Sequence, residues 1–247
     1  YSVPWRMYEK RRVILDRFPE PELMNNELQA LAYSEADFSS SDSDLLQRLD
    51  GLLAEFGKTF DAEGTFVDLG CGPGNISELL AVNWPSVSLI GIDGAHEMIN
   101  LALKRKEDLK RKLKIELKGL SYRCLDISSL ANKSISLYPK ADVVISNSLL
   151  HHLHDPSTLW KAMKNIATPG AFVFHRDLRR PIDHEQLVYL QKKHLSNGPS
   201  ILINDFLASL RAAFSLEEVH TQLDNEGLSR LNVFAVGDRY LEISGIL

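Results

Sequence analysis

The chain has little cysteine: only Cys71 and Cys124 occur in its 247 residues. Cys71 lies inside a glycine-rich turn and Cys124 near the end of an expected strand, so the two do not form the framework of a disulfide-stapled domain. This cysteine usage favours a reducing compartment, and we expect a cytoplasmic protein. Internal repeats are absent too, which argues against the repeat architectures.

Long apolar runs and a strong net charge are also missing. No apolar stretch approaches the length of a membrane span, and residues 1–22 lack the uninterrupted apolar core of a signal peptide. The formal net charge of −5 disfavours a general nucleic-acid binder. The basic runs at 104–106 and 110–112 have no interleaved aromatic residues for stacking on bases. We therefore expect neither a membrane nor a nucleic acid as a partner.

What the chain does have is an apolar content of 44%, enough to bury one sizeable α/β core. Its most informative stretch is TFVDLGCGPGN, at 65–75. Residues 66–69 predict a short buried strand, residues 70–74 a tight glycine-rich turn, and residues 76–81 the start of an amphipathic helix. This arrangement lets backbone N–H groups approach a ligand closely, because glycine tolerates the turn and lacks a Cβ.

The spacing of the turn separates two kinds of nucleotide site. A dinucleotide fingerprint that starts at Gly70 needs glycine or alanine at the position of Asn75, and the third glycine comes one residue early, at Gly74. A nicotinamide cofactor is therefore disfavoured. A second apolar strand, 87–92, leads into Asp93, whose carboxylate can accept both hydroxyls of a ribose.

The pattern D-x-G-x-G-x-G from Asp68, followed by an acid at the end of the next strand, resembles the class I S-adenosylmethionine-dependent methyltransferases. The chain is most similar to their small-molecule groups, type 11 and type 12/25. The resemblance implies an α/β fold, a three-layer α/β/α sandwich. Its mostly parallel sheet would have seven strands in the order 3-2-1-4-5-7-6, with a C-terminal antiparallel hairpin. It also implies S-adenosylmethionine as the cofactor and S-adenosylhomocysteine as the product.

The same resemblance divides the chain. Residues 1–44 would form an N-terminal arm and a helical lid, and residues 45–247 the methyltransferase domain, with a helical insertion at about 182–212. Tyr33 and Phe38 would belong to the lid and contact the substrate. Both can equally be core aromatic residues.

The resemblance also carries over to single cofactor residues. The turn 70–74 would lie against the amino-acid end of the cofactor, and Asp68 would orient this turn or the cofactor's ammonium group. Asp93 would hold the ribose, and Asp126, after the third strand, would hold the adenine. Asp126 can instead cap the next helix, and Asn75 is well placed to cap the helix after the turn. The expected cofactor residues are Asp68, Gly70, Cys71, Gly72, Gly74, Asn75, Asp93, Gly94, Met98, Asp126, Ile127, Asn147 and Ser148.

The fourth strand, 141–146, is the most apolar stretch of the chain and leads into SNSLLHHLHDP. A metal site is one interpretation of its histidines. Adjacent histidines on a strand or helix diverge, however, and no cysteine or glutamate cluster completes a ligand set. We therefore expect no metal.

The same run is similar to the segment after the fourth strand in small-molecule methyltransferases. There the first residues border the transferable methyl group, and a histidine lies near the acceptor. A histidine that titrates near neutrality can take the proton of the acceptor. The catalytic candidates are Asn147, His151 and His152. Either histidine can instead be structural, and the sequence leaves open which of them faces the pocket.

Three arginines surround Asp177 in the run 175–181, which we expect to be a loop at the carboxyl edge of the sheet. Guanidinium groups suit a carboxylate or a phosphate, so Arg176, Asp177 and Arg179 are candidates for binding an anionic substrate. The alternative is a loop held by internal ion pairs with Asp177, Asp183 or Glu185.

These features predict methyl transfer to a small acceptor, which can be anionic, by in-line displacement. The partner would be this small molecule, and a homodimer is compatible with the sequence. Two motifs are missing after the fourth strand: the (Asp/Asn)-Pro-Pro-(Tyr/Phe) run of adenine and glutamine methyltransferases, and a Pro-Cys nucleophile. Two alternatives stay open. One is aminopropyl transfer on the same scaffold, which would need an acid where Asn147 stands. The other is a non-catalytic protein that works through protein contacts.

Overall fold

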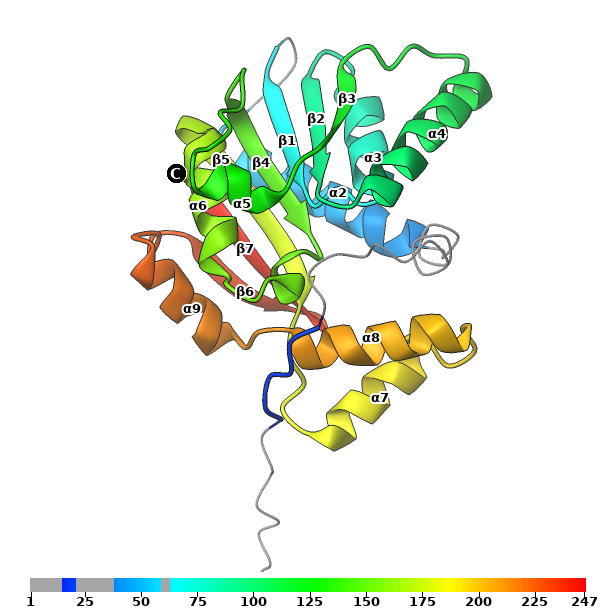
Figure 1. Ribbon diagram of the computed structural model, residues 1–247, viewed down its shortest axis with the longest axis vertical. Coiled ribbons are helices and arrows are strands. Elements are labelled where there is room, and N and C mark those ends of the chain that lie inside the picture. The colour runs from blue at the N-terminus through cyan, green and yellow to red at the C-terminus, as the bar shows by residue number, and fades with distance from the viewer. Residues whose placement is uncertain (1–14, 21–37, 59–62) are drawn as a thin grey trace, which may run out of the picture.

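The computed structural model describes residues 15–20, 38–58 and 63–247, and it shows a sheet with helices on both faces (Figure 1). The strands are β1 Thr65–Leu69, β2 Ser88–Asp93, β3 Leu120–Cys124, β4 Ala141–Asn147, β5 Ala167–Leu178, β6 Asn232–Val236 and β7 Tyr240–Ile246. The helices are α2 Ser39–Glu55, α3 Asn75–Asn83, α4 His96–Leu113, α5 Ile127–Ala131, α6 Ser157–Ile166, α7 His184–His194, α8 Ser200–Ala212 and α9 Leu216–Asn225, with a 3₁₀ turn η1 at Leu150–His152.

The seven strands form one sheet in the order β3-β2-β1-β4-β5-β7-β6. Strands β1 to β5 pair in parallel, whereas β7 is antiparallel to both β5 and β6. All five residues of β1 are buried, as expected for a central strand that is covered on both faces. The predicted class, strand order and closing hairpin are therefore confirmed.

Two apolar layers hold the helices to the sheet. On one face, α5, α6 and α9 cover β1, β4 and β7 through a core that includes the fully buried Trp160. On the other face, α2 and α3 pack on a second core built around Phe66, Phe172 and Phe174. Helix α2 begins at Ser39, within the residues assigned to the lid, and its leucines are part of this second core.

Strand β5 is longer than the sequence predicts. It continues through Pro169 and Gly170 at its start and through His175–Leu178 at its end, a stretch expected to be a loop. At the start Ala167 pairs with Ala141 of β4, and at the end β7 extends the ladder by pairing Arg176 with Glu242 and Asp177 with Leu241. A single sequence does not show how far a distant partner strand reaches.

Helices α7 and α8 form a pair at the carboxyl edge of the sheet, beside the dark-blue segment 15–20 (Figure 1). The pair has its own apolar cluster around Leu187, Leu190 and Leu210. Both helices lie within residues 182–212, the range for which a helical insertion is expected. None of the helices in the described ranges is long and apolar enough to cross a membrane.

Candidate cofactor and acceptor site

A cavity of about 930 Å³ opens at the carboxyl edge of the sheet. Its walls come from the ends of β1, β2, β4 and β5, from the start of β7, and from α8 across the opening. Its volume lies toward the upper end of the range for small-molecule sites. The expected cofactor residues that line it are Asp68, Gly70, Cys71, Gly72, Asn75, Asp93, Gly94, Met98, Asp126, Ile127, Asn147 and Ser148.

The glycine turn offers bare backbone to this cavity. The N–H groups of Gly70 and Cys71 both donate to the carbonyl of Ile92, at 2.7 and 3.0 Å, which ties the turn to β2. Gly72 has φ +52°, and no atom lies within 4 Å of the position that a Cβ would take. A ligand can therefore lie directly against Gly72, which is the property that the cofactor requires of this turn.

Gly74 has a different function from its neighbours, because it does not line the cavity. It has φ +88°, and a Cβ there would lie 2.4 Å from the hydroxyl oxygen of Tyr122. Gly74 is also the residue that caps α3, so the expectation that Asn75 caps this helix is wrong. Asn75 is the first helical residue, and its side-chain amide donates to Asp42 Oδ2 at 3.4 Å instead.

Asp93 holds the turn as well as lining the cavity. Its Oδ2 accepts the N–H of Gly72 at 2.9 Å, and its Oδ1 accepts the N–H of Ala95 at 2.8 Å, where α4 begins. Burial raises the pKa of Asp93, and these two N–H groups oppose the shift. The side chain expected to bind the ribose therefore also fixes the glycine backbone beside it.

Asp68 is fully buried behind the turn and accepts the hydroxyl of Ser77 at 2.6 Å. Burial raises its pKa to about 7, and the nearby carboxylates of Asp93 and Asp42 act in the same direction. Because this pKa lies near neutrality, a cation bound beside Asp68 would lower it and favour the charged carboxylate.

Asp126 caps a helix and also lines the cavity. One oxygen accepts the N–H of Ser128 at 2.8 Å and so caps α5, while the residue also lines the cavity. Ile127 follows it in the same wall, and Met98 reaches that wall from α4. An acid beside two apolar side chains is a suitable environment for a flat heterocycle with an amino group.

The backbone is strained directly after β4. Ser148 has φ +54°, which is uncommon for a residue with a side chain, and its N–H donates to the carbonyl of Arg176 at 2.9 Å. The turn directs Leu149 against Gly70, where an added Cβ would lie 2.8 Å from a leucine methyl. Strained residues of this kind concentrate at functional sites. This one places η1 against the cavity.

His151 in η1 lies between two carboxylates. Its Nδ1 is 2.5 Å from Oδ1 of Asp177, and its Nε2 is 3.4 Å from Oε1 of Glu20. Burial opposes a charge on the ring, but Asp177 and Glu20 together raise the pKa of His151. Burial also opposes ionisation of Asp177, yet His151 and His175 hold the pKa of this carboxyl well below its usual value.

His152 turns toward the same glutamate. Its Nδ1 lies 3.1 Å from Oε1 of Glu20, and its ring centroid is 4.2 Å from that of His151. The expectation that the two rings diverge is wrong, because a 3₁₀ turn places successive side chains differently from a strand or an α-helix. Both histidines line the cavity.

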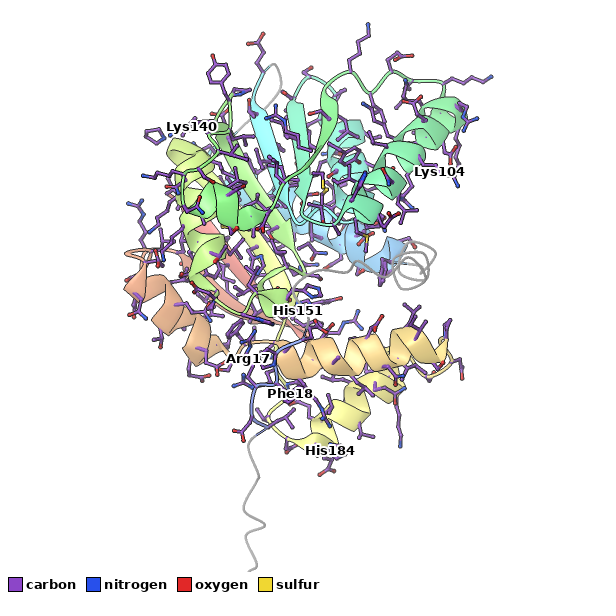
Figure 2. The ribbon with its side chains drawn as sticks, viewed as in Figure 1. Arg17, Phe18, Lys104, Lys140, His151 and His184 are labelled. Carbon is purple, nitrogen blue, oxygen red and sulfur yellow. The ribbon has the colours of Figure 1, made fainter. Side chains whose placement is uncertain are left out.

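Glu20 was missed by the sequence analysis. It belongs to segment 15–20, which crosses α8 and contacts η1. There the Arg17 guanidinium donates to the carbonyls of His151, Leu153 and Ala212 (Figure 2). The side chain of Glu20 is only 13% exposed and also accepts the hydroxyl of Ser209 at 3.0 Å. No sequence pattern near Glu20 indicates these contacts, because the partners that the described residues supply, among them His151 and Ser209, are more than 100 positions away.

The arginines of β5 do not face the cavity in the way expected. Arg176 does line it, but its guanidinium is buried and pairs with Glu242 and with Asp44. Asp177 and Arg179 do not line it. Phe38 lines the cavity, whereas Tyr33 lies outside the described residues.

Two further residues reach the cavity from the start of β7. Arg239 lies over the ring of Tyr240, 4.8 Å from its centroid, and both line the cavity. Arg239 forms no ion pair with any of the described residues. The sequence does contain a signal for this placement. A strand that pairs antiparallel with β5 must begin at the edge of the sheet where the parallel strands end.

Comparison with known proteins agrees with this geometry. A family profile described as a methyltransferase domain matches residues 41–231. A ubiquinone biosynthesis O-methyltransferase of Bordetella bronchiseptica is 33% identical over 114 residues, covering 46% of this chain and 42% of the relative. A trans-aconitate 2-methyltransferase of Methylobacterium nodulans is 31% identical over 110 residues, covering 44% of this chain and 36% of the relative. The chain thus matches less than half the length of these curated relatives.

Solved structures share the fold at low identity. A plantazolicin methyltransferase, BamL, in complex with S-adenosylhomocysteine (SAH) and a substrate analogue, has a TM-score of 0.61 at 18% identity, over 84% of this chain and 70% of that one. A SAM-dependent methyltransferase of Aquifex aeolicus has a TM-score of 0.57 at 19% identity, over 88% and 97%. With the profile spanning most of its length, the chain belongs to the methyltransferase-domain family, within the class I S-adenosylmethionine-dependent methyltransferases.

Proposed function

We propose that this protein transfers a methyl group from S-adenosylmethionine to a small acceptor. The observation that carries the proposal is one cavity whose lining includes both a bare glycine turn and two histidines. Asn147, at the end of β4, lines the wall of the same cavity. The curated relatives named above are also named for small-molecule methylation.

The cofactor would lie along the strand ends. Gly70–Gly72 would contact its amino-acid end, with Asp68 behind the turn favouring a bound ammonium group. Asp93 would hold the ribose, and Asp126 with Ile127 the adenine. The open space at Gly72 supports this placement. When bound, S-adenosylmethionine supplies an activated methyl group on a sulfonium centre.

The residues of this chain would contribute mainly positioning. Attack on a sulfonium methyl is an in-line displacement that needs no acid for the leaving group, so the acceptor must be held close and away from water. His151 and His152 border the acceptor end of the cavity. Asp177 and Glu20 contact the ring of His151 and so set its orientation. Either histidine could receive the acceptor's proton.

We further propose that the acceptor carries a negative charge. The sequence made Arg176 a candidate for binding this charge, but Arg176 already forms ion pairs with Glu242 and Asp44. Arg239 instead lies on the cavity wall over Tyr240 with no ion pair among the described residues. Its guanidinium could bind a carboxylate or phosphate of the acceptor.

Calorimetric titration of the protein with S-adenosylmethionine, SAH and NADH tests the cofactor. We expect micromolar binding of the first two, a weaker affinity in Asp93→Asn, and no binding of NADH. A screen of hydroxylated acids with labelled cofactor then tests the acceptor, and Arg239→Gln should raise KM for an anionic acceptor without changing SAH affinity. Absence of SAH binding would refute the methyltransferase proposal.

A further inference from the structure

Three side chains converge beside the cavity: His151 and His152, which line it, and Glu20, which does not. Oε1 of Glu20 lies 3.4 Å from Nε2 of His151 and 3.1 Å from Nδ1 of His152. One donor atom from each residue lies within 4.8 Å of the other two. None of the three is on the surface: Glu20 is 13%, His151 4% and His152 18% exposed.

These separations fit ligands that share one metal ion. Metal–nitrogen and metal–oxygen bonds of about 2.0–2.2 Å place two ligands about 3.0 Å apart at a right angle and about 3.4 Å apart at a tetrahedral angle. Both glutamate–histidine distances fall close to these values. The donor nitrogens of the two histidines lie within 4.8 Å of each other, so a small change in the orientation of one ring would let both reach the same ion.

A second feature is the residue behind His151. Asp177 contacts Nδ1 of this ring at 2.5 Å, so that its Nε2 points toward Glu20. Metal-binding histidines almost always have such a carboxylate or carbonyl on their other nitrogen, because it sets the tautomer and the ring orientation. The cluster also contains two carboxylates, Asp177 and Glu20, whose charges a divalent cation would balance when both histidines are neutral.

We propose that Glu20, His151 and His152 bind a divalent transition metal ion of the zinc type. Two imidazole nitrogens and one carboxylate oxygen suit zinc and its neighbours, whereas magnesium and calcium favour oxygen ligands. Three protein ligands leave at least one coordination position open. Because His151 and His152 line the cavity, an ion held by them would lie beside it, and a molecule in the cavity could occupy that position.

The role of the metal ion in catalysis rests on the proposed methyl transfer, whereas the binding of the ion to these three residues does not. An acceptor hydroxyl that coordinates the ion has a lowered pKa and loses its proton to water as the metal–oxygen bond forms. The oxygen then attacks the sulfonium methyl, and the carbon–sulfur bond breaks to give the thioether. The histidines would hold the ion instead of accepting the proton.

The test uses the full chain without a polyhistidine tag, freed of metal by a chelator and titrated calorimetrically with Zn²⁺. We expect one ion per chain. Glu20→Gln and His152→Ala should each weaken Zn²⁺ binding at least about tenfold, and Asp177→Asn about 10- to 100-fold. His220→Ala is the control, because it removes an exposed histidine on α9, outside the cavity. Co²⁺ should give a visible absorption band that the same variants lose.

Titration with SAH on the same samples keeps the two proposals distinguishable. Retained SAH binding with weakened Zn²⁺ binding in the cluster variants would support the metal site. No Zn²⁺ binding by the wild type, or binding that the variants leave unchanged, would overturn it. The cluster would then be a hydrogen-bonded carboxylate–histidine group, and the proposed methyl transfer would stand.

Discussion

At the scale of single residues, Gly72 can be compared with Gly227. Both have positive φ, +52° and +70°, and neither has an atom within 4 Å of an added Cβ. Gly72 lines the cavity, whereas Gly227 is exposed after α9. Alanine should cost each site about 1–2 kcal/mol of unfolding free energy, because a Cβ disfavours the left-handed region.

Only Gly72→Ala should affect the cofactor, since its methyl group enters the space that the cofactor would fill. We expect SAH affinity to fall by tenfold or more in Gly72→Ala and to stay unchanged in Gly227→Ala, measured by calorimetry. Equal affinity in the two variants would show that the cofactor does not lie against the turn.

Asp68 predicts a pH dependence of stability. Its pKa in the folded protein is about 7, above its ordinary value of 3.8. The folded state therefore binds more protons than the unfolded state between these values, and the unfolding free energy falls as the pH rises from about 4 to 7. The slope from this group can reach about 1.4 kcal/mol per pH unit.

Urea unfolding at pH 5, 6, 7 and 8 measures this effect. The difference between the wild type and Asp68→Asn isolates the contribution of Asp68, because asparagine can still accept the hydroxyl of Ser77 but does not titrate. Parallel curves for the two proteins over this range would contradict the raised pKa.

At the scale of elements, the pairing of β5 with β7 contains a buried ion pair. Arg176 is 2% exposed and Glu242 1% exposed; Arg176 Nε donates to Glu242 at 2.8 Å, and Arg48 reaches the same carboxylate at 3.1 Å. Glu242→Leu leaves a buried guanidinium without this partner and should lower the unfolding free energy by about 3–5 kcal/mol.

The double variant Arg176→Met/Glu242→Leu should recover most of this loss, because replacing a buried ion pair by apolar groups is often close to neutral. Chemical denaturation of the single and double variants measures it. A double variant as unstable as Glu242→Leu would mean that Arg176 stabilises the fold through contacts other than this pair.

At the scale of the whole molecule, the apolar core is divided. The two layers beside the sheet are separate from the cluster of α7 and α8 around Leu187, Leu190 and Leu210. Leu190→Ala should destabilise the helical pair by about 2–5 kcal/mol. Since the pair has its own cluster, we expect this effect to be local.

Hydrogen exchange tests the division. In Leu190→Ala, the amides of α7 and α8 should exchange faster while those of β1 and β4 keep their protection, and SAH should bind as before. Ile182→Ala is the control, because this side chain is 50% exposed. Faster exchange throughout the sheet would show that the molecule opens as one unit.

The glycine turn and the two acids after the neighbouring strands could be predicted because each is recognised from residues close to it in the sequence. The glycine turn, Asp93 and Asp126 each lie at the end of an apolar strand, and parallel strands bring their carboxyl ends to one edge whatever else the chain does. Residue spacing therefore indicated a ligand site at this edge, and the resemblance to class I methyltransferases added the sheet order and the segment that contains His151.

The surroundings of His151 and the charges on the cavity wall were decided only by the tertiary structure. Glu20 reaches the ring of His151 from segment 15–20, Arg239 reaches the cavity wall from the start of β7, and Arg176 turns inward because β7 supplies Glu242. These contacts join residues tens to hundreds of positions apart, and no local pattern records which partner a side chain will meet. The sequence by itself determined the fold class and the glycine turn with its two acids, through strand periodicity, turn spacing and the family resemblance that these carry. Packing between distant segments determined which charges remain to face the cavity.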